Sequence, residues 1–187
     1  MTRVQQLVGS EAPADVDGGK PTPGVVVWFT GLPSSGKSSF AERVQQRLIK
    51  NGRACCTLDS DHVRELLKPM PGYTEQERDD FYTTLGNLAG QLAQPGLVVL
   101  VPATSSKRIY RAHARLHAPH FIEVWLNSGV DECRKRDGKG LYARFAQGRV
   151  TGLPGEDVSY EPPYSPDVQA SGGQDEPAIK QLFLRLS

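Results

Sequence analysis

Apolar residues follow two different spacings along the chain, which indicate two kinds of secondary structure. Four short, largely apolar runs are predicted to be strands, and the first of them is continuously apolar, which is typical of a strand covered on both faces. They are residues 25–30 (VVVWFT), 54–59 (ACCTLD), 97–103 (LVVLVPA) and 121–126 (FIEVWL). Between the runs, apolar positions recur every three or four residues, as on one face of a helix. The predicted helices are residues 38–50, 61–68, 74–94, 105–116, 130–136 and 176–186.

Local sequence signals mark the ends of several predicted helices. Asn51-Gly52 ends the first, because glycine readily adopts the left-handed conformation of a helix C-terminus. Thr74-x-x-Glu77 has the form of a capping box at the start of the third. Residues 138–173 are rich in glycine and proline, so we predict a loop there.

Strands that alternate with helices predict an α/β fold with a parallel sheet flanked by helices. Ligands of such sheets bind at the carboxyl ends of the strands. Residues 31–38, Asp59, Asp61 and residues 103–106 all fall at predicted strand ends. We therefore expect them to form one site. Residues 24–187 form the predicted domain, and residues 1–23 a flexible extension with a short helical turn at residues 4–8.

Composition narrows the classes of partner. The chain has 187 residues, a net charge of +1 and three cysteines, two of them adjacent. A near-neutral chain lacks the field that suits long nucleic acid or a membrane surface. No apolar stretch approaches the roughly 20 residues of a membrane span. We therefore expect neither a nucleic-acid nor a membrane partner. The three cysteines suggest no disulfide framework, so we expect reduced thiols and a cytoplasmic protein.

The stretch GLPSSGKSS, residues 31–39, has the spacing G-x-x-x-x-G-K-[ST] of a phosphate-binding loop, or P-loop. The alternative is a chance Gly/Ser turn, but a strand before it and a helix after it favour the P-loop. Backbone N–H groups would wrap a phosphate, Lys37 would reach the outer phosphates, and the Ser38 hydroxyl would ligate Mg²⁺. The expected ATP-binding residues are Gly31, Ser34, Ser35, Gly36, Lys37, Ser38 and Ser39. The predicted fold is that of the P-loop containing nucleoside triphosphate hydrolases.

Two aspartates end the second predicted strand. Asp59 and Asp61 lie two residues apart, so in extended geometry both side chains point the same way. Beside a Mg-nucleotide, one carboxylate could support the metal and the other accept a proton from an attacking hydroxyl. The alternative is that Asp61 caps the helix that follows. The two readings are compatible.

Basic residues supply candidate contacts to anions. Arg64 and Arg78 could fork onto phosphate or sulfate oxygens, although a single arginine on a helix is more often a solvated charge. The segment RKRDGKGLYAR, residues 134–144, is basic and hinged by glycines. It suits a mobile lid over phosphates, at about residues 138–155, better than the alternatives of a solvated loop or a nucleic-acid patch.

Five stretches together resemble one family. VVWFTGLPSSGKSS, LDSDHVR, GYTEQER, RDGKGLYAR and YEPPYSPD fall in the order and spacing of adenylyl-sulfate kinases, or APS kinases. The P-loop is generic, whereas LD-x-D-x-x-R with RD-x-KGLY is specific to this family and its close relatives. The resemblance implies transfer of phosphate from MgATP to the 3′-hydroxyl of adenosine 5′-phosphosulfate. It also implies a homodimer, a small-molecule substrate, and ATP and Mg²⁺ as cofactors.

The resemblance also implies roles for individual residues. Asp61 would be the base, Asp59 would support Mg²⁺, and Lys37 and Ser105 would complete the catalytic residues. Tyr73 stands where an aromatic ring packs on the substrate adenine. The implied substrate-binding residues are Asp61, Arg64, Tyr73, Arg78, Phe81, Ser105, Lys139, Gly140, Leu141 and Leu153. Ser38 and Asp59 form the expected metal set, and Arg136 joins the ATP-binding residues.

The chain departs from the family pattern on the acceptor side. Phe81 stands in place of an asparagine that contacts substrate, and Thr83 and Thr84 in place of arginines. Leu153 replaces an aromatic residue that would stack on adenine. These departures predict either a divergent APS kinase, with lost charge supplied by a neighbouring basic residue, or a related kinase with another hydroxyl acceptor.

The basic residues that could supply this charge are Lys107 and Arg108. A third hypothesis is a nucleotide-binding module without turnover. The complete set of P-loop and carboxylate residues argues against that hypothesis, because a site without turnover need not keep its base.

Overall fold

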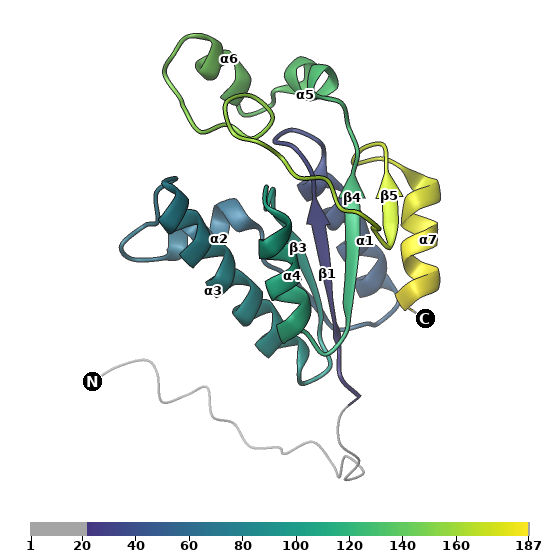
Figure 1. The fold of residues 1–187 in the computed structure, drawn as a ribbon. Helices are drawn as coiled ribbons and strands as arrows, with labels where there is room; N and C mark the ends of the chain where they lie inside the picture. Colours follow the sequence, from purple (N-terminus) through teal and green to yellow (C-terminus); the bar gives the residue numbers. More distant parts are fainter. Residues whose placement is uncertain (1–21, 187) are drawn as a thin grey trace, which may run out of the picture.

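The computed structural model describes residues 22–186, and a five-stranded sheet runs through their centre (Figure 1). Its strands are β1 (Val25–Thr30), β2 (Cys55–Thr57), β3 (Val98–Pro102), β4 (Phe121–Leu126) and β5 (Val168–Ala170). The spatial order is β2-β3-β1-β4-β5, and every neighbouring pair is parallel. The predicted parallel α/β architecture is therefore confirmed, with β1 at the centre.

Helices cover both faces of the sheet, with α1 and α7 on one side and α2, α3 and α4 on the other (Figure 1). Two further helices, α5 and α6, lie beyond the carboxyl ends of the strands. The helices are α1 (Lys37–Lys50), α2 (Ser60–Leu66), α3 (Glu75–Ala93), α4 (Arg108–His117), α5 (Val130–Arg136), α6 (Leu141–Ala146) and α7 (Glu176–Leu186).

Alternate residues of β1 pack into two separate cores. Val27 and Phe29 face α1 and α7, whereas Val26 and Trp28 face α3 and α4. All six residues of β1 are buried. Its continuous apolar sequence thus follows from being covered on both faces.

Several predicted elements begin or end elsewhere in the structure, and three of the differences are informative. The second strand is shorter than predicted, because Leu58 leaves it and Asp59 caps α2. The fourth predicted helix begins at Arg108 instead of residue 105, because Ser105 has a φ of +38° that no right-handed helix accepts. Residues 138–173 are not all loop, since they contain α6 and β5. The capping box of Thr74 and Glu77 is confirmed.

Most of the predicted N-terminal extension, including the helical turn at residues 4–8, lies outside the described residues. Within the described part, no helix is long and apolar enough to cross a bilayer. Cys55, Cys56 and Cys133 are all free thiols, in agreement with the absence of a disulfide framework.

Candidate active site

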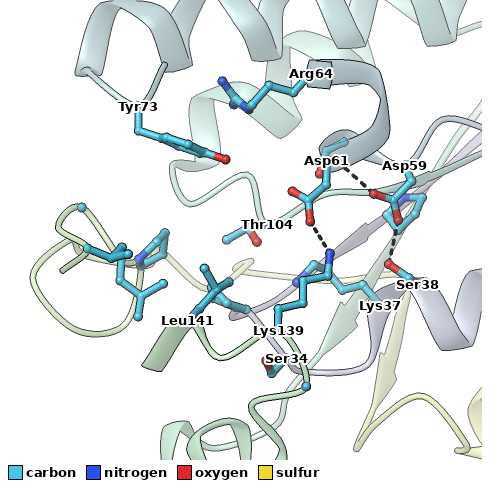
Figure 2. Close-up of a pocket in the computed structure, with 18 of the residues that line it drawn as sticks. Ser34, Lys37, Ser38, Asp59, Asp61, Arg64, Tyr73, Thr104, Lys139 and Leu141 are labelled. Atoms are coloured by element: carbon cyan, nitrogen blue, oxygen red, sulfur yellow. Dashed lines mark hydrogen bonds and ion pairs between the residues drawn. The ribbon is translucent and has the colours of Figure 1, made fainter. Parts of the chain in front are cut away.

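A cavity of about 810 Å³ opens at the carboxyl edge of the sheet, where the predicted site residues were expected to meet. The P-loop, the start of α2, the side chains of α3 and the segment after α5 all contribute to its wall (Figure 2). Fourteen predicted residues line it: Ser34, Gly36, Lys37, Ser38, Ser39, Asp59, Asp61, Arg64, Tyr73, Arg78, Arg136, Lys139, Leu141 and Leu153. These fourteen residues therefore share one cavity at the strand ends.

The P-loop has the backbone turn that phosphate binding requires. Ser34 and Gly36 have φ values of +61° and +98°, so the chain curls before α1 begins at Lys37. Such a curl directs successive N–H groups inward, next to the positive end of a helix. The expected Gly31 and Ser35 belong to this turn but do not line the cavity wall.

Lys37 lies at the floor of the cavity. Its Nζ donates to the carbonyls of Gly31 and Leu32, at 3.0 and 2.7 Å. Burial lowers the pKa of Lys37 to about 8, although the carboxylates of Asp61 and Asp59 partly oppose this shift. A buried ammonium held by only two carbonyls is well suited to meet an anion.

Asp59 joins the P-loop to α2. Its carboxylate accepts a hydrogen bond from the Ser38 hydroxyl at 2.7 Å and another from the Asp61 N–H at 3.0 Å (Figure 2). Asp59, not Asp61, is therefore the N-cap of α2, and the expected extended geometry of the two aspartates is wrong. The two nevertheless lie close together, because the cap brings Asp61 into the first helical turn.

Asp61 faces a cation from the segment predicted to form a lid. Its carboxylate accepts a hydrogen bond from Lys139 Nζ at 2.5 Å, beside Lys37 and Ser38 of the P-loop (Figure 2). This hydrogen bond raises the pKa of Lys139. Gly140, whose φ is +62°, turns the chain from Lys139 into α6 and lies outside the cavity wall. Lys139, which is distant in sequence, thus contacts the predicted base Asp61.

Arg64 and Arg78 are buried, so the reading of either as a solvated surface charge is wrong. Arg64 Nη1 donates to the carbonyls of Pro71 and Gly72, at 3.1 and 2.7 Å. Both guanidiniums line the cavity and keep N–H groups beyond those used in these contacts.

Arg78 connects two rims of the cavity. Its Nε donates to the Tyr73 carbonyl at 2.9 Å, and its Nη2 donates to the Gly152 carbonyl at 2.6 Å. The loop before α3 is thereby tied to the far end of the predicted lid.

The aromatic residues differ in their access to the cavity. Tyr73 is 63% exposed and lies against Arg64, with the guanidinium carbon 4.6 Å from the ring centroid. Phe81 is 2% exposed and lies outside the cavity wall, 3.8 Å from the same guanidinium. Any effect of Phe81 on the acceptor would therefore act through neighbours that line the cavity, such as Arg64. Leu153 lines the cavity and packs with Tyr142 and Cys133.

Ser105 lies outside the cavity wall, although substrate contact was expected. Its hydroxyl accepts a hydrogen bond from Trp28 Nε1 at 3.0 Å and lies within hydrogen-bond distance of Thr30 and of the Ala103 carbonyl. Its left-handed backbone instead places Thr104 in the wall. The role of Ser105 in catalysis stays a prediction.

The basic residues proposed to replace lost charge point elsewhere. Lys107 pairs with Glu75 and Asp79, at 2.5 and 3.2 Å. Arg108 donates to the Tyr164 hydroxyl and packs against its ring. Neither lines the cavity, so the structure does not support a compensating role for them.

Several lining residues were not named individually from the sequence, although all but Tyr82 fall in segments that it assigned to the site. Tyr82, Thr104, Arg144 and residues 150–152 contribute to the wall. Tyr82 sits at a periodic core position of α3, where a buried ring is the ordinary expectation. Arg136, which was predicted, donates to the Ser35 carbonyl and to the Ser128 hydroxyl at 3.3 and 3.2 Å, and so supports the P-loop from the β4 side.

Comparison of the sequence and of the structure with known proteins finds similar ones. The family described as Adenylylsulphate kinase matches residues 23–171. An adenylyl-sulfate kinase from Microcystis aeruginosa is 38% identical over 78% of this chain and 81% of its own length. An adenylyl-sulfate kinase from Picosynechococcus is 35% identical over 88% of this chain and 94% of its own length.

Among solved structures, the APS kinase CysC of Mycobacterium tuberculosis in complex with AMPPNP and APS has a TM-score of 0.82 and 36% identity. The match covers 89% of this chain and 100% of that one. This likeness confirms the predicted P-loop fold.

Proposed function

This chain belongs to the adenylylsulphate kinase family, and we propose that its cavity carries out the family reaction with the residues described above. The enzyme transfers the γ-phosphoryl group of ATP to the 3′-hydroxyl of adenosine 5′-phosphosulfate, giving 3′-phosphoadenosine 5′-phosphosulfate and ADP. One observation carries the assignment of residues. A single cavity holds a P-loop lysine, a carboxylate pair and two buried guanidiniums.

The donor half consists of the P-loop and the residues around it. The N–H groups at the start of α1 and the Lys37 ammonium bind the ATP phosphates. On binding, Lys37 exchanges its two carbonyl partners for phosphate oxygens, which balance its charge better. Arg136 supports the same loop from the side of β4.

The hydroxyl of Ser38 and the carboxylate of Asp59 suit Mg²⁺. Both are hard oxygen ligands, they lie 2.7 Å apart, and they stand at the phosphate end of the loop. Mg²⁺ typically takes one or two protein oxygens and fills its shell with phosphates and water. When bound, it neutralises charge that develops on the phosphates.

The acceptor half is organised around Asp61. Asp61 receives the proton of the attacking hydroxyl, and Arg64 and Arg78 hold the phosphosulfate end. Lys139 must first leave Asp61, because a carboxylate paired with an ammonium is a poor proton acceptor. The phosphates of ATP offer Lys139 a more highly charged partner. Binding of ATP thus both supplies the phosphoryl group and frees the base.

The test is the release of ADP from MgATP with and without adenosine 5′-phosphosulfate. We expect strong stimulation by the acceptor. ATP binding without stimulation would shift the assignment to another hydroxyl acceptor, which a panel of nucleosides and sugars would then identify. Neither binding nor turnover would contradict the kinase assignment itself.

The assembly and compartment are part of the same proposal. A homodimer follows from the family resemblance, and Ile109 and Leu116 offer it an exposed apolar strip on one face of α4, at 65% and 83% exposure. Free thiols suit a cytoplasmic enzyme. Light scattering of the purified chain gives its mass in solution, and a monomer would contradict the dimer.

A further inference from the structure

Tyr82 is a buried phenol in the wall of the acceptor half. It is 7% exposed and belongs to a stack of aromatic rings on the face of the sheet that carries α3. Its ring lies 4.5 Å from that of Tyr110 and 5.3 Å from that of Phe81, between ring centroids. These neighbours hold the ring in one orientation, which also fixes where its hydroxyl lies.

The Tyr82 hydroxyl has a proton to donate. The oxygen accepts the N–H of Ser105 at 3.0 Å. A phenol that accepts one hydrogen bond still carries its own O–H donor. Among the hydrogen bonds of residues 22–186, none uses this proton. Burial raises the pKa of Tyr82, so the hydroxyl stays protonated at neutral pH.

The position of this donor indicates what it meets. Tyr82 lines the cavity together with Arg64, Arg78 and Thr104. The two guanidiniums make this part of the wall cationic, and both contribute to the electrostatic environment of the Tyr82 hydroxyl. A buried donor beside two cations best fits an anionic oxygen, because hydrogen bonds to charged acceptors are stronger than those between neutral groups.

We infer that Tyr82 is an acceptor-binding residue whose O–H donates to the phosphosulfate end of the substrate, beside Arg64 and Arg78. This inference rests on the proposed function, which supplies the identity of the acceptor. It assigns to α3 a polar contact that Phe81 does not itself make, because the Phe81 ring lies outside the cavity wall. The hydroxyls of Tyr82 and Thr104 then add uncharged donors to this part of the wall.

The test is Tyr82→Phe, which removes one oxygen and keeps the ring. We expect the KM for adenosine 5′-phosphosulfate to rise roughly ten- to a hundredfold, as for loss of a hydrogen bond to a charged group, with the KM for MgATP unchanged. Tyr110→Phe is the matched control. Its hydroxyl donates to Asp79 at 2.5 Å in the same aromatic stack, but it does not line the cavity, so its acceptor KM should stay at the wild-type value.

A second comparison separates binding from a structural role. Tyr82→Phe also leaves the Ser105 N–H without its acceptor. This structural loss would weaken the binding of every ligand of the acceptor half to the same extent. We therefore compare the binding of adenosine with that of adenosine 5′-phosphosulfate. A contact to the phosphosulfate lowers the preference for the charged ligand about tenfold or more and leaves adenosine binding unchanged. A parallel loss for both ligands would overturn the inference.

A measurement on the wild-type enzyme keeps the inference testable if the variant folds poorly. The chain has six tyrosines, so labelling their ζ carbons with ¹³C gives a countable set of signals. We expect the Tyr82 signal to shift with adenosine 5′-phosphosulfate and not with adenosine. An unchanged signal under saturating acceptor would overturn the inference, whereas a wild-type enzyme inert toward this acceptor would instead overturn the proposed function.

Discussion

Lys37 shows how one half-buried residue couples nucleotide binding to protonation. Its pKa is lowered to about 8 because burial disfavours the ammonium. Bound phosphates favour the ammonium and raise this pKa again. Above pH 8, therefore, the enzyme must take up a proton before Lys37 can pair with ATP.

We predict that the number of protons taken up per ATP bound rises from about 0.1 at pH 7 to about 0.9 at pH 9, as a group with a pKa of about 8 requires. ATP affinity should fall over the same range. Calorimetry in buffers of different ionisation enthalpy measures the uptake. Lys37→Arg is the control, because its guanidinium stays charged, and this variant should show no such proton uptake. Uptake that does not change between pH 7 and pH 9 would contradict the prediction.

Asp61→Asn tests the base directly. The amide keeps the size of the side chain but cannot accept the hydroxyl proton, so kcat should fall about 10²- to 10⁴-fold while ATP affinity changes little. Asp80→Asn makes the same chemical change on α3, where Asp80 is exposed and contacts Gln76, and should leave kcat intact. Steady-state ADP release measures both variants. A near-normal rate for Asp61→Asn would remove it as the base.

The sequence predicts some of these contacts and hides others. Ser38 and Asp59 were expected to share a metal, and they do lie within hydrogen-bond distance, because both follow from motif spacing at strand ends. Ser105 and Tyr82 could not be placed in this way. The left-handed turn at Ser105 has no glycine to announce it, and Tyr82 follows the ordinary apolar periodicity of α3.

At the scale of elements, α6 depends on a carboxylate outside it. Gly140, its N-cap, has no side chain, and Asp137 instead accepts the N–H groups of Tyr142 and Ala143, at 3.1 and 2.9 Å. These bonds hold the start of a helix of six residues, which is too short to be stable alone. They also set the direction of the chain through Lys139.

Asp137→Ala should therefore loosen α6 and misplace Lys139. We expect amide exchange over residues 141–146 to accelerate roughly 5- to 30-fold, the equivalent of about 1–2 kcal/mol for a lost cap, and the KM for ATP to rise several-fold. Asp131→Ala is the control, because this aspartate on α5 is 81% exposed and pairs only with Arg134. Hydrogen exchange with mass spectrometry measures the effect, and equal exchange in the two variants would refute it.

Element prediction succeeded where one signal dominated. Strands β1 and β4 and helices α5 and α7 have the predicted bounds, since continuous apolar runs and strict helical periods define them. Strand β5 has three residues within a Gly- and Pro-rich stretch, and pairing with β4 stabilises it more than local propensity does. A pairing partner distant in sequence leaves no local signal.

For the whole molecule, stability comes from two cores that share the sheet. Leu182 of α7 is fully buried in the core that contains α1, whereas Leu184, two residues later, is 80% exposed. We predict that Leu182→Ala lowers the free energy of unfolding by about 2–5 kcal/mol, and Leu184→Ala by less than about 0.5 kcal/mol. Urea unfolding measures both. Equal losses would show that α7 does not pack on the sheet as described.

The strand order also bears on how such an enzyme can change during evolution. Strand β1 carries the P-loop, β2 and β3 lead to Asp61 and Thr104, and β4 leads to Arg136 on the opposite side. Asp61, Arg64 and Arg78 of the acceptor half thus follow β2, whereas Lys139 and Leu153 reach the same cavity from the segment after β4. A duplicated gene can rewrite these two segments and acquire a new acceptor, while the P-loop that follows β1 continues to bind the same phosphate donor.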